Sequence, residues 1–126
     1  MNKFENMDKL SPNNNCLFSL SKLEALTDGD KEAIGHFNTV FLQETVAKDL
    51  PLIRKYFADR DFQQMRKYAH KMKSSIELYC IVDIIPVIRE LEKLATNEPD
   101  IDRMNSMLVN VENTLHTVRE QMSQLV

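Results

Sequence analysis

A single histidine lies among basic and hydroxyl side chains in the segment from Asp61 to Cys80, DFQQMRKYAHKMKSSIELYC. If this segment is helical, side chains three and four residues from His70 share its face. Those neighbours are Arg66, Lys67, Lys73 and Ser74. Because nearby cations disfavour a charged imidazolium, we expect His70 to be neutral near neutral pH. One ring nitrogen is then available as a nucleophile or as a hydrogen-bond acceptor.

The spacing of the apolar residues predicts that His70 faces solvent. Apolar side chains recur at steps of three and four, as in an amphipathic helix, at Phe62, Met65, Ala69, Met72, Ile76 and Tyr79. At about 100° per residue, His70 lies roughly 130° from the middle of this stripe. The stripe should face a core, so the histidine should be displayed. For His36 and His116, which lie in no comparable motif, we expect no ligand role.

The run from His70 to Ile81, HKMKSSIELYCI, resembles the signature of histidine phosphotransfer (HPt) domains. In that signature an apolar residue, a lysine, a glycine and a serine follow the histidine, and a second glycine comes later. The similarity extends over roughly residues 17–122. Ser74 replaces the first glycine and Cys80 replaces the second. Ser74 is small enough to keep the surface flat, whereas the Cβ of Cys80 tolerates a positive φ less well than glycine does.

The resemblance implies a two-way relay of a phosphoryl group. Nε2 of His70 would attack the phosphoaspartate of a receiver domain and hand the group to a second receiver in the same geometry. Lys73 would neutralise the phosphoryl oxygens, while Ser74 and Ser75 would leave room for the phosphate or donate to it. Contacts with the partner are also implied for Arg66, Lys67, Lys71 and Glu77. The three cations would steer an acidic receiver surface, and Glu77 would reach the ring only through water.

The same resemblance implies the partners and the cofactor requirement. The partners would be receiver domains of response regulators and a hybrid histidine kinase. We expect no cofactor on this chain, because the Mg²⁺ used in the transfer belongs to the receiver and no carboxylate cluster here forms a metal site. The chain is expected to be a phosphocarrier and not a kinase, since its only two glycines, Gly29 and Gly35, cannot build a P-loop or a dinucleotide turn.

Length and composition predict one globular domain that binds neither membranes nor nucleic acids. The chain has 126 residues, 43% of them hydrophobic and 28% charged, and its net charge of −3 argues against a nucleic-acid partner. No apolar run approaches the roughly 20 residues that span a bilayer. The polar start of the chain is unlike a secretory signal, so we expect a cytoplasmic protein. The start at Met1 and the tail that follows it favour a stand-alone protein, and we expect a monomer. In that compartment Cys80 is expected to be a buried thiol.

Apolar periodicity predicts an all-α fold, namely an antiparallel four-helix bundle with a short N-terminal capping helix. Residues 1–15 lack periodicity and are predicted to be a flexible tail, while residues 16–126 form the bundle domain. The last helix has the clearest pattern, with apolar residues stepping three and four from Ile101 to Leu125. Pro51 should kink or break an earlier helix, with Asp49 as a possible new cap.

Two other interpretations stay open beside the phosphocarrier. A helical bundle of the same fold could bind a receiver or a kinase as a scaffold without accepting phosphate, and the loss of both signature glycines motivates this alternative. The composition by itself also fits an unrelated structural bundle. Burial of the His70 face by self-association would favour the structural bundle, whereas an open face would count against it.

Overall fold

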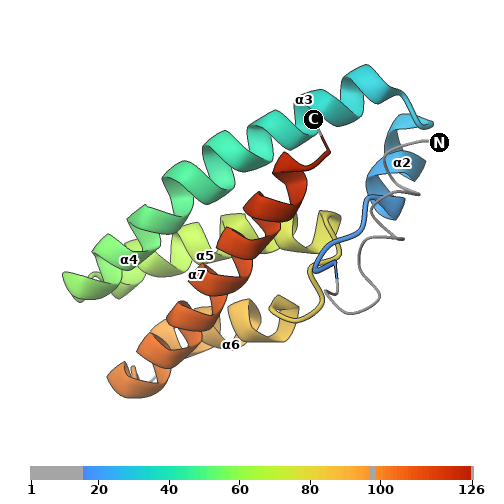
Figure 1. Ribbon diagram of the computed structural model, residues 1–126. Helices are drawn as coiled ribbons and strands as arrows, with labels where there is room; N and C mark the ends of the chain where they lie inside the picture. Colours follow the sequence, from blue (N-terminus) through green and yellow to red (C-terminus); the bar gives the residue numbers. More distant parts are fainter. Residues whose placement is uncertain (1–15, 97–98, 126) are drawn as a thin grey trace.

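The computed structural model describes residues 16–96 and 99–125, and every regular element within those ranges is a helix (Figure 1). The elements are α2 (Ser21–Thr27), α3 (Lys31–Val40), η1 (Phe41–Asp49), α4 (Leu50–Ala58), α5 (Phe62–Leu78), α6 (Ile85–Thr96) and α7 (Ile101–Ser123). The predicted all-α class is confirmed for this part of the chain. The predicted flexible tail, residues 1–15, lies outside the described residues. No described helix is both long enough and apolar enough to cross a membrane.

The elements α3, η1 and α4 follow one another without a gap as one helical rod (Figure 1). The helix therefore does not break at Pro51, which was one of the two outcomes predicted there. The middle of the rod, η1, is π-helical, and at its end the N–H of Leu50 donates to the carbonyl of Thr45. Pro51 follows in the first turn of α4. A change from five-residue to four-residue hydrogen bonding leaves one carbonyl without a helical donor. The missing N–H of Pro51 falls at this change of register, so the chain stays helical.

The apolar stripes predicted from the sequence form the core. On α5 the buried residues are Met65, Ala69, Met72 and Ile76. On α7 they are Met104, Leu108, Val111, Leu115, Val118 and Met122, which confirms the periodic pattern of that helix. α5 packs against α6, α4 and η1, and α7 packs against α6 and η1. Each fully buried side chain of this kind stabilises the fold by about 1.5–3 kcal/mol, so the stripe fixes which face of α5 remains outside.

Local backbone signals define where α5 begins and ends. Its N-terminus is capped by Asp61, whose side chain accepts a hydrogen bond from the N–H of Gln64 at 3.3 Å. Arg60, just before the cap, has a φ of 60°, and Cys80, just after the helix, has a φ of 53°. Cys80 is half-buried and not buried as predicted. The left-handed conformation is one that glycine adopts more readily than cysteine, as the sequence analysis notes for this position.

The first helix, α2, buries only part of its apolar surface. Leu23 is fully buried, whereas Leu26, three residues later, is 65% exposed. α2 has only seven residues and packs against α3, so one narrow face is covered. The hydroxyl of Ser19 accepts from the N–H of Ser21 at 3.2 Å, at the start of this helix.

Candidate functional site

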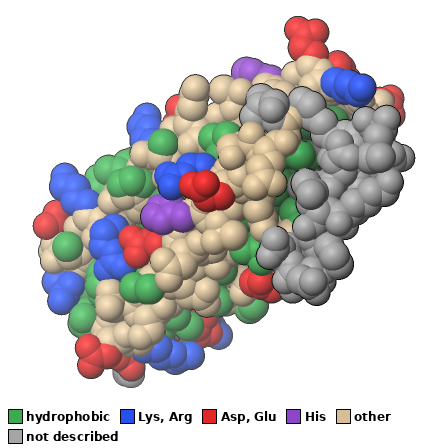
Figure 2. Space-filling view, in the orientation of Figure 1, with side chains coloured by type: hydrophobic (Ala, Val, Ile, Leu, Met, Phe, Trp, Pro, Cys, Tyr) green, Lys and Arg blue, Asp and Glu red, His purple; other side chains and the backbone are tan. Residues whose placement is uncertain are grey.

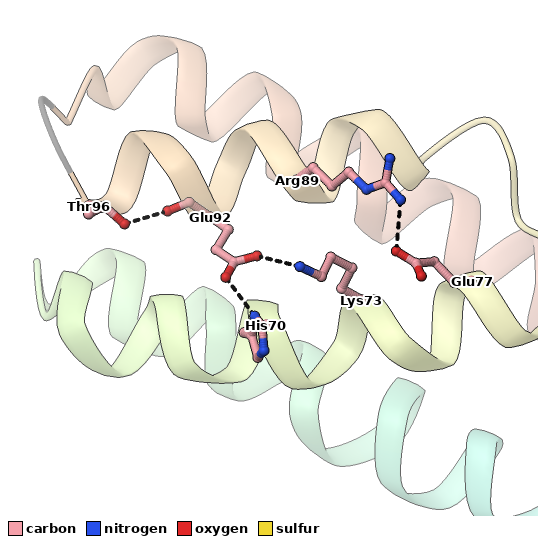
Figure 3. Close-up of polar contacts among 6 residues, drawn as sticks. All are labelled: His70, Lys73, Glu77, Arg89, Glu92 and Thr96. Carbon is pink, nitrogen blue, oxygen red and sulfur yellow. Dashed lines mark hydrogen bonds and ion pairs between the residues drawn. The ribbon is translucent and has the colours of Figure 1, made fainter.

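His70 lies on the outer face of α5, and its side chain is 66% exposed, as its position in the helix predicts. Its Nδ1 is 2.7 Å from Oε1 of Glu92, a residue of α6 (Figure 3). An ionised carboxylate can only accept hydrogen bonds, so this contact requires the proton on Nδ1. The second ring nitrogen, Nε2, lies on the side of the ring away from Glu92 (Figure 3). In the neutral ring, Nε2 therefore carries the free lone pair.

The same carboxylate holds Lys73. Its Oε2 is 3.4 Å from Nζ of Lys73, so Glu92 bridges the histidine and the lysine one turn later (Figure 3). The side chains of Lys73 and Glu92 are 26% and 22% exposed, which makes the pair less screened by water than the histidine ring. The sequence-based expectation of purely cationic surroundings for His70 is therefore wrong. The missing anion comes from a different helix, which neighbour counting along α5 cannot find.

The packing of α6 on α5 brings Glu92 to the site. Ile88, Leu91 and Ala95 form the buried stripe of α6, and Glu92 lies at the edge of that stripe, one turn after Ile88. The hydroxyl of Thr96 donates to the backbone carbonyl of Glu92 at 3.0 Å. Sequence periodicity could have placed Glu92 at this edge. It could not have shown which residue of α5 lies opposite, because that depends on the register between two packed helices.

Arg66 and Lys67 lie on the His70 side of α5, where the sequence places them. The guanidinium of Arg66 donates to the hydroxyl of Thr96 at 3.4 Å, which ties this cation to the C-terminal end of α6. Lys67 and Ser74 are both exposed. The predicted small residue one turn beyond His70 is therefore present at an open surface.

Two predicted site residues point away from His70, toward η1. The ammonium of Lys71 lies 3.2 Å from the carboxylate of Asp49, which is buried. The side chain of Asp49 makes no capping hydrogen bond to α4, so the cap considered for it in the sequence analysis is not formed. The hydroxyl of Ser75 accepts from that of Thr45 at 3.2 Å. Five residues rotate the chain by about 140° around a helix. Ser75 is thus on another face, and the structure does not bring it to His70.

Glu77 also has a different partner from the one considered in the sequence analysis. Its Oε1 accepts from the guanidinium of Arg89, a residue of α6, at 3.1 Å (Figure 3). The contact lies along the same seam between α5 and α6 as the Glu92 contacts. Glu92, and not Glu77, is the carboxylate that orients the imidazole.

The surface around the site mixes charges of both signs. Figure 2 shows basic and acidic side chains interspersed around a surface histidine on the face in view. Within residues 16–96 and 99–125, no group of three or more histidine, cysteine, aspartate or glutamate side chains is arranged to hold a metal ion. The chemistry that these side chains offer is that of an oriented imidazole nucleophile with an ammonium group beside it.

Comparisons with protein-family models, with curated proteins and with solved structures match nothing to this chain. The features that indicate a function are therefore the geometry of the residues and the sequence signature around His70. The groups that carry chemistry are the exposed Nε2 of His70, the ammonium of Lys73 and the carboxylate of Glu92 that contacts both.

Proposed function

We propose that this protein is a histidine phosphotransfer protein of a two-component phosphorelay. It accepts a phosphoryl group on His70 from the aspartate of a receiver domain and passes the group to another receiver. The observation that carries this proposal is the exposed imidazole whose Nδ1 is held at 2.7 Å by a carboxylate, because that contact turns the lone pair of Nε2 outward. The chain acts as a carrier and not as a kinase with its own ATP site.

The transfer step needs placement more than covalent help from the protein. The Nε2 lone pair attacks the phosphorus of the receiver's phosphoaspartate. The bond between phosphorus and the aspartate oxygen breaks, and its electron pair returns to the aspartate as a carboxylate. Lys73 lies one helical turn from His70 and neutralises charge on the equatorial oxygens. Mg²⁺ is bound by the receiver, and this chain supplies no cofactor.

The proposed fold is the antiparallel four-helix bundle with a capping helix that the resemblance implies. Support comes from the packing of α5 between α6 on one side and α4 with η1 on the other, and from the short helix α2 against α3. Receiver domains, including that of a hybrid histidine kinase, dock on the exposed face of α5. Arg66 and Lys67 steer them there, with Ser74 beneath the incoming phosphate. The protein works as a monomer in the cytoplasm.

A second candidate is a scaffold of the same fold that binds a receiver or a kinase without accepting phosphate. The contact that favours it is the ion pair between Lys73 and Glu92 at 3.4 Å. A carboxylate next to the phosphoryl position repels the incoming anion and already occupies the lysine.

The two candidates are separated by following a labelled phosphoryl group. A panel of receiver domains, each phosphorylated on its aspartate with radiolabelled phosphate, is mixed with the wild type and with His70→Gln. The carrier predicts acid-labile, base-stable label on the wild type and none on the variant. Equal label on both proteins overturns the assignment to His70. Receiver capture that persists in His70→Ala, with no label on the wild type, supports the scaffold.

A further inference from the structure

We propose that Cys16 and Cys80 form a reversible disulfide that ties the segment before α2 to the end of α5. They are the only two cysteines of the sequence, and both line one hollow of about 530 Å³ beside the end of α5. The structure holds both as half-buried thiols. The reaction is a thiol–disulfide exchange with a small-molecule disulfide such as oxidised glutathione. The inference goes beyond the proposed phosphotransfer function and does not depend on it.

The backbone brings the two cysteines together although they are far apart in the sequence. The N–H of Ser19 donates to the carbonyl of Tyr79 at 2.9 Å, so the segment before α2 runs beside the chain that follows α5 (Figure 1). Three residues of chain span at most about 10 Å, which bounds the distance from Cys16 to this hydrogen bond. The other residues that line the hollow are Leu17, Phe18, Ser19, Val82 and Asp83. Val82 and Asp83 are exposed, so a small solute can reach the hollow from water.

Cys80 is the fixed end of the proposed bond. Its N–H donates to the carbonyl of Glu77 at 3.0 Å, and the N–H of the buried Ile81 donates to the carbonyl of Ile76 at 3.1 Å. The φ of Cys80 is 53°, in the left-handed region that disfavours a Cβ. Such strain persists where the surrounding structure imposes it, and it can mark a functional position. A redox role accounts for a thiol at a position that suits glycine better.

Cys16 is the end that moves to close the bond. It lies outside any helix, next to Leu17, whose N–H donates to Oε1 of Gln121 at 2.9 Å. Its Sγ donates to the carbonyl of Phe18 at 3.2 Å, and Sγ of Cys80 lies 3.9 Å from a carbonyl of its own segment. Thiols are weak donors, so these contacts are readily exchanged for a covalent bond. A disulfide needs Cα atoms about 4.4–6.8 Å apart, and a shift of Cys16 about its link to Leu17 brings it to that distance.

The exchange takes place in two steps. The thiolate of one cysteine attacks a sulfur of the small disulfide, the S–S bond of that molecule breaks, and one small thiol leaves with the proton. The thiolate of the other cysteine then attacks the protein sulfur of the mixed disulfide, and the second small thiol leaves with the second proton. Two electrons pass from the protein to the small disulfide, and an excess of the small thiol reverses both steps.

The new bond closes a loop that contains α2 to α5, and therefore His70. A cross-link over a long loop lowers the conformational entropy of the unfolded chain, so it favours the folded state. By the same linkage, the folded protein should form the disulfide more readily than the unfolded chain does. This relationship is what the experiment measures.

The test determines the disulfide equilibrium of the full chain in glutathione buffers, under native conditions and in concentrated urea. Acid stops the exchange, the remaining thiols are alkylated, and the intact mass gives the fraction of chains with an internal disulfide. Proteolytic peptides then identify the bond between Cys16 and Cys80. We expect an equilibrium constant at least about 10-fold higher in the folded protein than in urea. An equal or lower constant in the folded protein overturns the inference.

Cys16→Ser and Cys80→Ser are the matched controls, because each keeps one thiol and nearly the same shape. Both should stop at the mixed disulfide with glutathione, and oxidation should not raise their thermal midpoints. Oxidation should raise the thermal midpoint of the wild type, and reduction should restore it. The inference fails if the oxidised wild type carries two glutathione groups, if its disulfides join two molecules, or if it unfolds no later than the reduced form.

Discussion

Lys71 of α5 and Asp49 of η1 form an ion pair at 3.2 Å in which one partner is buried and the other is not. Asp49 is 1% exposed, whereas the Lys71 side chain is 58% exposed. Both carboxylate oxygens are close to the ammonium, since the second lies at 3.3 Å. The pair fastens α5 to the π-helical segment on the side opposite to the contacts of Glu92. Lys71, which the sequence analysis predicts to contact a receiver, therefore helps to hold two helices together.

The two ends of this pair should respond unequally to mutation. Lys71→Met leaves a buried carboxylate without its cation, so we expect a loss of about 1–3 kcal/mol in the free energy of unfolding. Asp49→Asn keeps the shape and leaves a lysine that water can solvate, so its loss should be smaller. Urea unfolding of both variants measures the difference. Equal stability of Lys71→Met and the wild type would show that the pair contributes nothing.

Cys80→Gly should stabilise the protein. A residue with a Cβ pays about 1–2 kcal/mol in the left-handed region that Cys80 occupies, and the extra freedom of glycine in the unfolded chain offsets about 0.5–1 kcal/mol of that gain. We expect a net increase of up to about 1 kcal/mol in the free energy of unfolding. Cys80→Ala, which keeps the Cβ, is the control and should gain nothing. A lower thermal midpoint for Cys80→Gly than for Cys80→Ala would contradict the strain argument.

Tyr79 should make the stability fall at high pH. Burial raises the pKa of Tyr79, a residue that is 1% exposed and whose hydroxyl donates to Oδ1 of Asn38 at 2.8 Å. The folded state therefore holds the phenol proton more tightly than the unfolded chain does. This contribution is complete below the unfolded pKa of about 10 and declines above it by up to about 1.4 kcal/mol per pH unit, until the folded-state pKa is reached.

The variant Tyr79→Phe isolates that effect. It loses one hydrogen bond, so it should be less stable than the wild type near neutral pH by about 1 kcal/mol. Above about pH 10 its stability should fall less steeply, because its buried ring has no proton to lose. Urea midpoints measured from neutral to alkaline pH compare the two proteins. Parallel curves above the unfolded pKa would rule out Tyr79 as the source of the decline.

Lys73→Met should slow phosphotransfer, while Lys67→Met should mainly weaken the encounter with the receiver. In the proposed transfer Lys73 neutralises the phosphoryl oxygens, so we expect a loss of about 10- to 100-fold in the transfer rate at saturating receiver. Lys67 is exposed on the same face. Its removal should lower the association rate at low salt only, because surface charges are screened as ionic strength rises. Single-turnover transfer at two salt concentrations distinguishes the two variants. If Lys67→Met lowers the transfer rate as much as Lys73→Met does at both concentrations, Lys73 has no special role in the transfer step.

The helical class of the described chain and the side of α5 on which His70 lies could both be predicted from the amino-acid sequence. Both depend on local periodicity, because steps of three and four residues place one stripe toward the core and the opposite side toward water. The stripe from Met65 to Ile76 is buried and His70 is exposed for that reason. The buried stripe of α7 could be predicted in the same way, because its steps of three and four residues lie within a single helix.

The groups that surround the histidine could not be predicted from the sequence, because they depend on how the helices pack. Glu92 reaches His70 through the register between α5 and α6, and Asp49 reaches Lys71 through the packing of η1. Neither contact follows from spacing within one helix, because relative sliding of two packed helices by one turn would exchange the partners. The continuous helix through Pro51 is of the same kind, since the π-helical segment η1 packs on α5 and α7 and leads directly into the first turn of α4, which contains Pro51.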